Sequence, residues 1–125
     1  MSPLPKSADW VVSPPLAPEG PAIDIDHLAR MTLGERELER EVLTLFAQQS
    51  TDLLVRLEKL PREGASLAHT LKGSARGIGA FAVADAADRL EQNLRQGLPV
   101  TAEVAGLQQA VGSALAAIAE RLQTL

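Results

Sequence analysis

One short stretch of the chain, residues 68–80 with the sequence AHTLKGSARGIGA, contains the side chains best able to do chemistry. His69 is followed by Lys72 three residues later and by glycines at 73, 77 and 79. An exposed imidazole is largely uncharged near neutral pH and is a nucleophile without a base to activate it. A lysine one helical turn away would place positive charge beside the ring. The stretch therefore indicates either a reactive histidine on a helix or a glycine-rich loop for a nucleotide.

The glycine-rich interpretation rests on residues 73–79, GSARGIG, which resemble the glycine turn of short-chain dehydrogenases. A dinucleotide loop of that kind follows a buried parallel strand and opens a helix, so that backbone amides face the pyrophosphate. The preceding residues 62–72, REGASLAHTLK, hold one β-branched residue and alternate like a helix, and no strand rich in Val or Ile is expected after residue 12. A helix that carries His69 is therefore favoured over a nucleotide-binding loop.

A helix over this stretch would turn His69 toward solvent. At about 100° per residue, Leu67, Leu71, Ser74 and Ile78 lie opposite the histidine and take the buried side. The exposed face around His69 then carries Ser66, Lys72, Gly73 and Arg76. A glycine inside a helix costs about 1 kcal/mol relative to alanine. Gly73 therefore suggests that another molecule has to approach the backbone beside the histidine.

Five helical segments are expected to position this face. They are predicted at about residues 24–31, 35–60, 62–78, 80–96 and 100–124, and Asp24, Gly34, Pro61, Gly79 and Gly97 mark their ends. Short connections make consecutive helices antiparallel. The predicted fold is all-α, an antiparallel up-and-down four-helix bundle with a short extra N-terminal helix.

Apolar residues at spacings of three and four predict which sides of the two longest helices face the core. In the segment 35–60 the predicted inward residues are Leu38, Val42, Leu45, Phe46, Leu53, Leu57 and Leu60. In the segment 100–124 they are Val104, Leu107, Val111, Leu115, Ile118 and Leu122.

Length and composition limit the classes of protein that remain. The 125 residues suffice for one domain, and the absence of cysteine excludes disulfides and thiolate metal sites. A net charge of -4 argues against general nucleic-acid binding, which requires a basic surface. No stretch is long and apolar enough to span a membrane, so a cytoplasmic location is expected. No metal-ligand spacing is present, and no metal site is predicted.

The N-terminal residues differ from the rest in composition. Six of the eight prolines fall in residues 1–21, so residues 1–22 are predicted to be a Pro-rich tail and residues 23–125 the helical bundle. Trp10, Val11 and Val12 form an apolar cluster in this tail. This cluster either docks on the bundle, which is the favoured interpretation, or binds a partner.

The segment from His69 to Ala75, HTLKGSA, followed by Gly79, resembles the H-x-L-K-G-S-[AS] signature of histidine-containing phosphotransfer (HPt) domains. The resemblance extends over the expected bundle, about residues 23–125, although only residues 67–81 are specific. It implies that His69 is phosphorylated on its outer ring nitrogen, that Lys72 holds the phosphoryl group and that Gly73 gives a partner access. Ser66 and Arg76 are added as binding candidates from the helical periodicity, because both lie on the same face.

The same resemblance implies a histidine phosphocarrier of a two-component phosphorelay. Its expected partners are the receiver domains of response regulators and a hybrid histidine kinase, and the chain is expected to be a monomer. The carrier would need no cofactor of its own, because the Mg²⁺ for transfer would belong to the receiver partner. It would be a stoichiometric intermediate and not an enzyme, because nothing in the sequence resembles an ATP-binding domain.

Two alternatives remain open beside the phosphocarrier. The chain could be a helical adaptor that binds receivers or other signalling proteins without phosphate, or a fragment of a histidine kinase, which the missing ATP-binding domain disfavours. Of the other polar residues, His27 is predicted to be a capping or surface residue. Asp85 and Asp88 are predicted to lie on a solvated helix face.

Overall fold

Five helices account for most of residues 20–125, the part of the chain that the computed structural model describes. They are α1 (Ile25–Met31), α2 (Arg36–Glu58), α3 (Gly64–Ile78), α4 (Phe81–Gln96) and α5 (Thr101–Thr124). No strand occurs within residues 20–125. The predicted all-α class is confirmed. Residues 1–19 lie outside the described part, and with them the predicted docking of Trp10, Val11 and Val12.

Local chemistry explains where most of the helices begin and end. The side chain of Asp24 caps α1 by accepting a hydrogen bond from the backbone N–H of His27 at 3.1 Å. Gly79 and Gly97 end α3 and α4 in the left-handed conformation, with φ of 89° and 70°. The start of α3 was predicted too early, because residues 61–63 form a turn in which the carbonyl of Pro61 accepts from Gly64 N–H at 3.0 Å.

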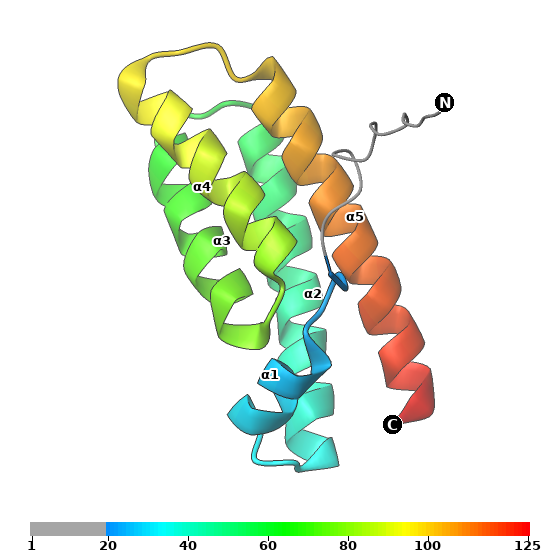
Figure 1. Ribbon diagram of the computed structural model, residues 1–125. Coiled ribbons are helices and arrows are strands. Elements are labelled where there is room, and N and C mark those ends of the chain that lie inside the picture. Colours follow the sequence, from blue (N-terminus) through cyan, green and yellow to red (C-terminus); the bar gives the residue numbers. More distant parts are fainter. Residues whose placement is uncertain (1–19) are drawn as a thin grey trace, which may run out of the picture.

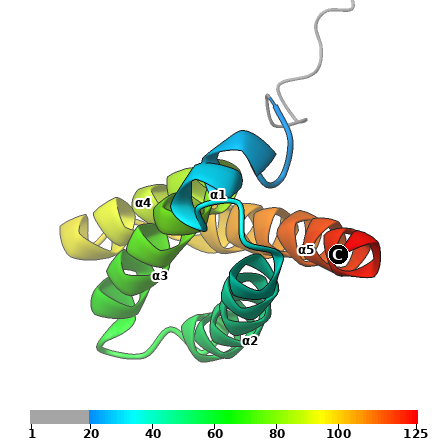
Figure 2. The same ribbon diagram turned by 90° about the horizontal axis from the view of Figure 1, so that it is seen from below.

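The four long helices form an up-and-down bundle with short connections (Figure 1). Each long helix packs against the next long helix in the chain, and α5 closes the ring by packing against α2. Seen from below, α1 lies across one end of the bundle (Figure 2). The predicted antiparallel four-helix bundle with a short N-terminal helix is therefore confirmed. None of the helices between residues 20 and 125 is long and apolar enough to cross a membrane.

The short helix α1 is attached to the C-terminal end of α3. His27 donates through Nε2 to the carbonyl of Gly77 at 3.0 Å, and its ring meets Phe81 edge-on with centroids 5.3 Å apart. A Cβ at Gly79 would lie 3.0 Å from the carbonyl oxygen of Asp24, so this close approach requires glycine. The prediction of a capping or surface role for His27 was therefore incomplete, because its side chain links α1 to α3.

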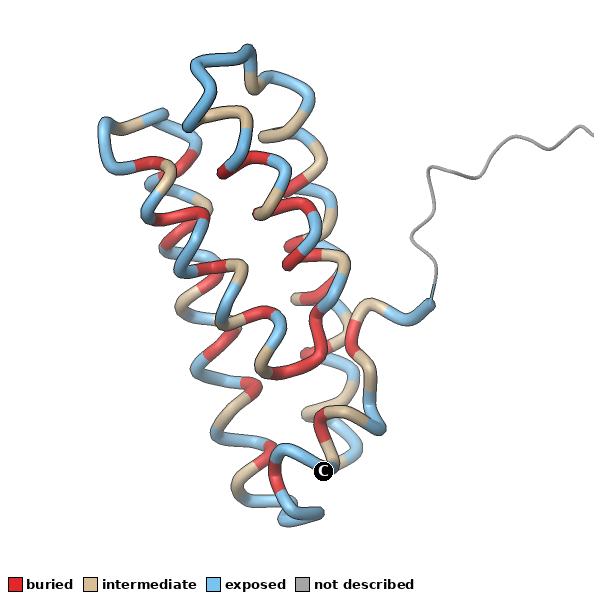
Figure 3. The backbone as a smooth tube through the Cα atoms, turned by 60° about the vertical axis from the view of Figure 1, so that its left-hand side comes forward, coloured by how far each residue is buried: buried red, intermediate tan, exposed pale blue. Residues whose placement is uncertain are grey.

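The core lies between the facing sides of the four long helices, where each helix has one buried side (Figure 3). Most of its fully buried large side chains are aliphatic, and they include Leu28, Leu43, Leu57, Leu71, Leu90, Leu107, Val111 and Ile118. Val104, Leu115 and Leu122 on α5 are only partly buried, at the edge of this core.

The predicted inward face of α2 was partly wrong. Phe46, Leu53 and Leu57 are buried as predicted, but Leu45 and Leu60 are 58% and 53% exposed, and the buried Leu43 was missed. The observed inward line also contains polar residues that the apolar pattern excludes, Glu39 and Ser50.

Glu39 is buried with a partner that the sequence pattern did not identify. Its Oε1 accepts a hydrogen bond from Arg121 Nη2 of α5 at 3.2 Å, which compensates the burial of the carboxylate. This pair lies on the side of α2 that faces α5, whereas the side that carries Leu45 is on the surface beside α3.

Candidate functional site

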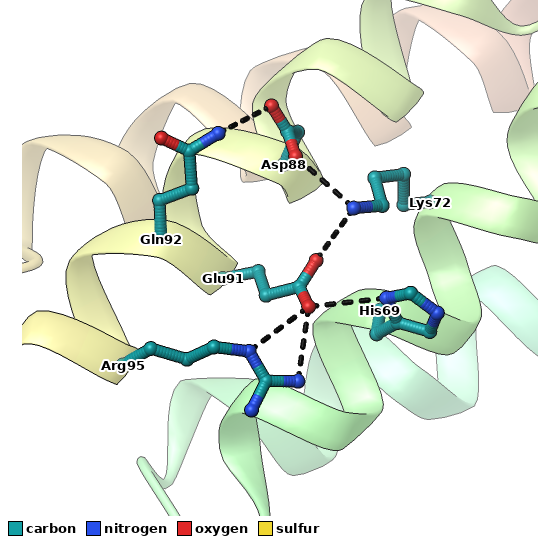
Figure 4. A network of polar contacts seen from close by, with 6 residues as sticks. All are labelled: His69, Lys72, Asp88, Glu91, Gln92 and Arg95. Carbon is teal, nitrogen blue, oxygen red and sulfur yellow. Dashed lines mark hydrogen bonds and ion pairs between the residues drawn. The ribbon is translucent and has the colours of Figure 1, made fainter.

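His69 lies in the middle of α3 and points to solvent, as predicted. Its side chain is 63% exposed, and its Nδ1 lies 3.0 Å from Oε2 of Glu91 on α4. Because an ionised carboxylate can only accept a hydrogen bond, Nδ1 must carry a proton. The lone pair of the neutral ring is then on Nε2, which points away from Glu91 (Figure 4). The ring is thus held in one orientation with its nucleophilic nitrogen outward.

Glu91 is the centre of a polar network between α3 and α4. Its side chain is only 8% exposed, and it contacts Lys72, His69 and Arg95 (Figure 4). Arg95 donates to Oε2 from both Nε and Nη2, at 3.1 and 3.0 Å. The ammonium of Lys72, followed by the bonds from Arg95 and His69, lowers the pKa of Glu91 from 4.5 to about 2 despite its burial. Glu91 is therefore ionised at neutral pH.

Lys72 faces α4 and not the open side of His69. Its Nζ lies 2.7 Å from Oε1 of Glu91 and 3.1 Å from Oδ1 of Asp88, and its side chain is 15% exposed. The contact with Glu91 is a close ion pair, although its angles differ from those of a regular hydrogen bond. These two carboxylates, Glu91 foremost, raise the pKa of Lys72. Lys72 was predicted to lie on the exposed face beside His69, whereas its ammonium is mostly covered and paired with two carboxylates of α4.

The charges of this network cancel. Lys72 and Arg95 contribute two positive charges, and Asp88 and Glu91 contribute two negative ones, so 2 minus 2 gives zero. Asp88 also accepts from Gln92 at 2.8 Å. The prediction that Asp88 belongs to a merely solvated face was therefore wrong, whereas Asp85 is exposed as expected.

The sequence interpretation missed Glu91 and Arg95. Both lie on α4, more than twenty residues from His69, and no motif joins them to the histidine. The sequence did contain a signal, the spacing of Glu91 and Arg95 with Asp88 and Gln92. Successive turns of the helix carry these polar residues three or four positions apart, so they form a polar line along α4. That line could not be assigned to His69 without knowing how α4 is rotated against α3.

Gly73 lies on the other side of His69, one helical turn along α3. It is exposed, and a Cβ added there would meet nothing within 4 Å. Beside it is a shallow apolar depression of about 450 Å³ between α2, α3 and the end of α1. We call its open part the α2–α3 surface, made of Met31, Val42, Leu45, Gln49 and Gly73. His69 thus has a charged network on its α4 side and an open apolar surface on its α2 side.

The two remaining predicted site residues lie further along α3. Ser66 and Arg76 are both exposed, on either side of His69 along the helix. Arg76 makes no ion pair with any residue in the range 20–125. Within the same range no group of three His, Asp or Glu side chains could hold a metal ion.

The low pKa of Glu91 gives a testable pH dependence. An ionised group whose pKa is lowered by folding stabilises the protein above its ordinary pKa, and this contribution disappears as the pH falls toward the folded value. Relative to Glu91→Gln, wild type should be more stable by about 1–2 kcal/mol at pH 7, and the difference should vanish between pH 4.5 and about 2.

Urea unfolding at a series of pH values measures this difference. Glu41→Gln is a suitable control because Glu41 is exposed on α2 and forms no ion pair within residues 20–125. A constant difference between wild type and Glu91→Gln down to pH 3 would show that the network does not stabilise the ionised carboxylate.

Comparisons with known proteins agree with this geometry. The sequence pattern of the Hpt domain family matches residues 41–125, which is more than half of the chain. Curated protein sequences gave no match. Among solved structures, the crystal structure of the histidine phosphotransferase ShpA from Caulobacter crescentus is similar, with 27% identity and a TM-score of 0.67. The similarity covers 82% of this chain and 92% of that one.

Proposed function

Because this chain belongs to the Hpt domain family, we propose that it carries a phosphoryl group on His69 in a two-component phosphorelay, exchanging it with aspartates of receiver domains. One observation carries the assignment to His69: its ring is exposed, and the buried Glu91 fixes Nδ1 so that Nε2 faces outward. The other histidine of the chain, His27, uses its Nε2 to hold α1 against α3.

The transfer step can be written with this geometry. The lone pair of Nε2 attacks the phosphorus of an aspartyl phosphate on the receiver, the N–P bond forms, and the bond between phosphorus and the carboxylate oxygen breaks. The aspartate leaves as a carboxylate. Nδ1 keeps its proton throughout, so the phosphorylated ring carries a positive charge that the ionised Glu91, 3.0 Å away, stabilises. Attack by a second receiver's aspartate reverses these bonds.

The chain supplies position and charge for this step, and other components come from the partner. Phosphoryl transfer depends mainly on in-line positioning and on compensating negative charge. Lys72 contributes through the network around Glu91, and the exposed Arg76 adds a positive charge further along the same helix. The Mg²⁺ that neutralises charge on the phosphoryl oxygens is expected to be held by the receiver.

The α2–α3 surface is the proposed docking area for the receiver. It is mostly apolar and includes Gly73 and Leu45, an exposed leucine in the middle of α2. Exposed apolar side chains grouped beside a reactive residue are typical of protein interfaces. A receiver seated here would meet His69 from the side that the charged network leaves open.

Changing Leu45 to glutamate should weaken receiver docking without unfolding the bundle. Leu45 is 58% exposed, so the new carboxylate stays solvated in the free protein and loses water only in the complex. We expect transfer at subsaturating receiver concentration to slow roughly tenfold, which corresponds to a loss of about 1.4 kcal/mol of binding free energy. Rapid-quench kinetics with a phosphorylated receiver measure this rate.

Val55→Glu provides the matched control for Leu45→Glu. Val55 is 48% exposed on the same helix but is not part of the α2–α3 surface. Equal rates for Leu45→Glu and Val55→Glu would exclude the proposed docking area.

Removing the charge of Lys72 should impair transfer while the fold persists. In Lys72→Ala the network charge changes from zero to -1, because Arg95 alone then faces Asp88 and Glu91. This excess negative charge repels the phosphoryl group, and we expect roughly tenfold slower transfer or a similarly shortened lifetime of phosphohistidine. Both are measured by following labelled protein over time; unchanged values in Lys72→Ala would show that the lysine is purely structural.

A direct experiment tests the proposed function. Purified protein is mixed with a receiver domain that carries labelled aspartyl phosphate, and acid-labile, base-stable phosphate on the chain is followed. We expect up to one phosphoryl group per chain and none when the chain is mixed with ATP alone. Receiver binding without any transfer would instead favour the non-catalytic adaptor. Stable labelling of His69 by ATP alone would contradict the expectation that the chain has no autokinase activity.

A further inference from the structure

An apolar groove lies between α4 and α5, on the opposite side of α4 from the charged network. Its floor is made of small residues, Ala82 and Ala86 from α4 and Gly106, Ala110 and Ser113 from α5. These side chains are too short to fill the space between the two helices. The groove has a volume of about 160 Å³, which is small for a free ligand and suits a single large side chain.

The N-terminal chain enters the bundle at one end of this groove. Ala22 lines the groove, and the next residue, Ile23, is buried in the core. Residues 1–19 therefore precede a segment that is already packed beside α4 and α5. The part of the chain best placed to fill the groove is the tail itself.

The tail contains one side chain of suitable size and chemistry. Trp10 is the only tryptophan of the chain, and Val11 and Val12 follow it. It precedes Ala22 by 12 residues (22 minus 10), which span up to about 37 Å in an extended proline-rich chain. The groove extends along α4 from Ala82 to Arg89, which are seven helical steps apart, or about 10 Å. Trp10 can therefore reach any part of it.

Charge complementarity supports the same occupant. Arg89 lines the groove and forms no ion pair with any residue between positions 20 and 125. Asp9 directly precedes Trp10 in the sequence. An indole in the groove would place this carboxylate where it could approach the guanidinium at the groove's edge.

We propose that the α4–α5 groove is the docking site of the chain's own N-terminal tail, with the indole of Trp10 as the buried anchor. Trp10 buries a large apolar area at a small cost in side-chain entropy, and proline-rich segments lose less entropy than others when they bind. At about 100° per residue, Ala82, Ala86 and Arg89 face nearly opposite to Glu91 and Arg95. The docked tail therefore leaves His69 accessible.

Intrinsic fluorescence tests this proposal on the full chain, because Trp10 is the only tryptophan and there is no tyrosine. We expect wild type to emit at shorter wavelength than a free peptide of residues 1–19 and to be quenched several-fold less by iodide. Gly106→Glu should remove both differences. The added side chain occupies the groove, and its carboxylate makes burial of the apolar indole there unfavourable. Emission and quenching of wild type equal to those of the peptide would overturn the proposal.

Three controls make the test specific. A Cβ meets nothing within 4 Å at either Gly106 or Gly112, and both glycines lie inside α5, so Gly112→Glu should keep the wild-type fluorescence. Ala117 lines the neighbouring groove between α2 and α5, and Ala117→Glu should leave the indole buried. If this variant exposes Trp10 instead, the indole docks in that neighbouring groove and the proposal is overturned. The indole could also be protected from iodide only at high protein concentration, with a doubled molecular mass in solution. That result would assign the groove to the tail of a second copy and overturn the proposal.

The phosphotransfer assay separates this proposal from the function of His69. Gly106→Glu should accept phosphate at the wild-type rate while its tryptophan is exposed. Loss of transfer in Gly106→Glu with an unchanged circular dichroism spectrum would contradict a docking site that is independent of the phosphotransfer face.

Discussion

Replacing His69 by glutamine is expected to abolish phosphate uptake from a phosphorylated receiver. The variant loses Nε2, the only nucleophile on the exposed face that the network orients outward. Glutamine is also polar and can donate to Glu91, and His69 is 63% exposed, so the fold should tolerate the change. We expect labelling to fall by at least about a thousandfold, as for the loss of an essential nucleophile.

His27→Gln is the matched control for His69→Gln. It removes the other histidine of the chain, and its amide can still donate toward the carbonyl of Gly77. We expect this variant to accept phosphate at nearly the wild-type rate, with somewhat lower stability because the contact with Phe81 is lost. Equal acid-labile labelling of wild type and His69→Gln would remove His69 from the mechanism.

A side chain at position 73 is expected to block transfer without disturbing the bundle. An added Cβ at Gly73 meets nothing within 4 Å, and glycine inside a helix is unfavourable by up to about 1 kcal/mol. Gly73→Gln should therefore fold as well as wild type or slightly better. Its side chain would stand where the receiver must approach His69, and a misplacement of about 1 Å can cost on the order of a hundredfold in rate.

Gly112→Gln on α5 controls for the change in helix propensity. Gly112 is also inside a helix and also leaves open space around an added Cβ. Both variants should show equal or raised melting temperatures, and only Gly73→Gln should transfer about a hundredfold more slowly. A normal transfer rate in Gly73→Gln would show that close approach to the backbone of α3 is not needed.

The orientation of His69 could be predicted because the local pattern is strong. Leu67, Leu71 and Ile78 repeat on one side of α3, and all three are buried. Helix ends could also be predicted from the sequence where a single residue determines them, as Asp24 does for α1 and Gly97 for α4. These features depend on neighbours within one or two turns of the same helix.

Features that depend on how helices face each other could not be predicted. The inward side of α2 includes Glu39, whose partner Arg121 lies on the last helix. The apolar pattern alone therefore predicted the wrong inward side for part of α2. The direction of Lys72 is set by Glu91 and Asp88 on α4, and neither can be assigned to α3 from spacing along the chain. The sequence thus located the exposed histidine but not the network that orients it.

The central claim is that Nε2 of His69 carries the phosphoryl group while Nδ1 stays protonated against Glu91. Nitrogen-15 and phosphorus-31 NMR of the phosphorylated, ¹⁵N-labelled protein tests it most directly. We predict phosphorus coupling to Nε2 of His69 and a protonated Nδ1. Phosphorus bound to Nδ1, or to a residue other than His69, would contradict the claim.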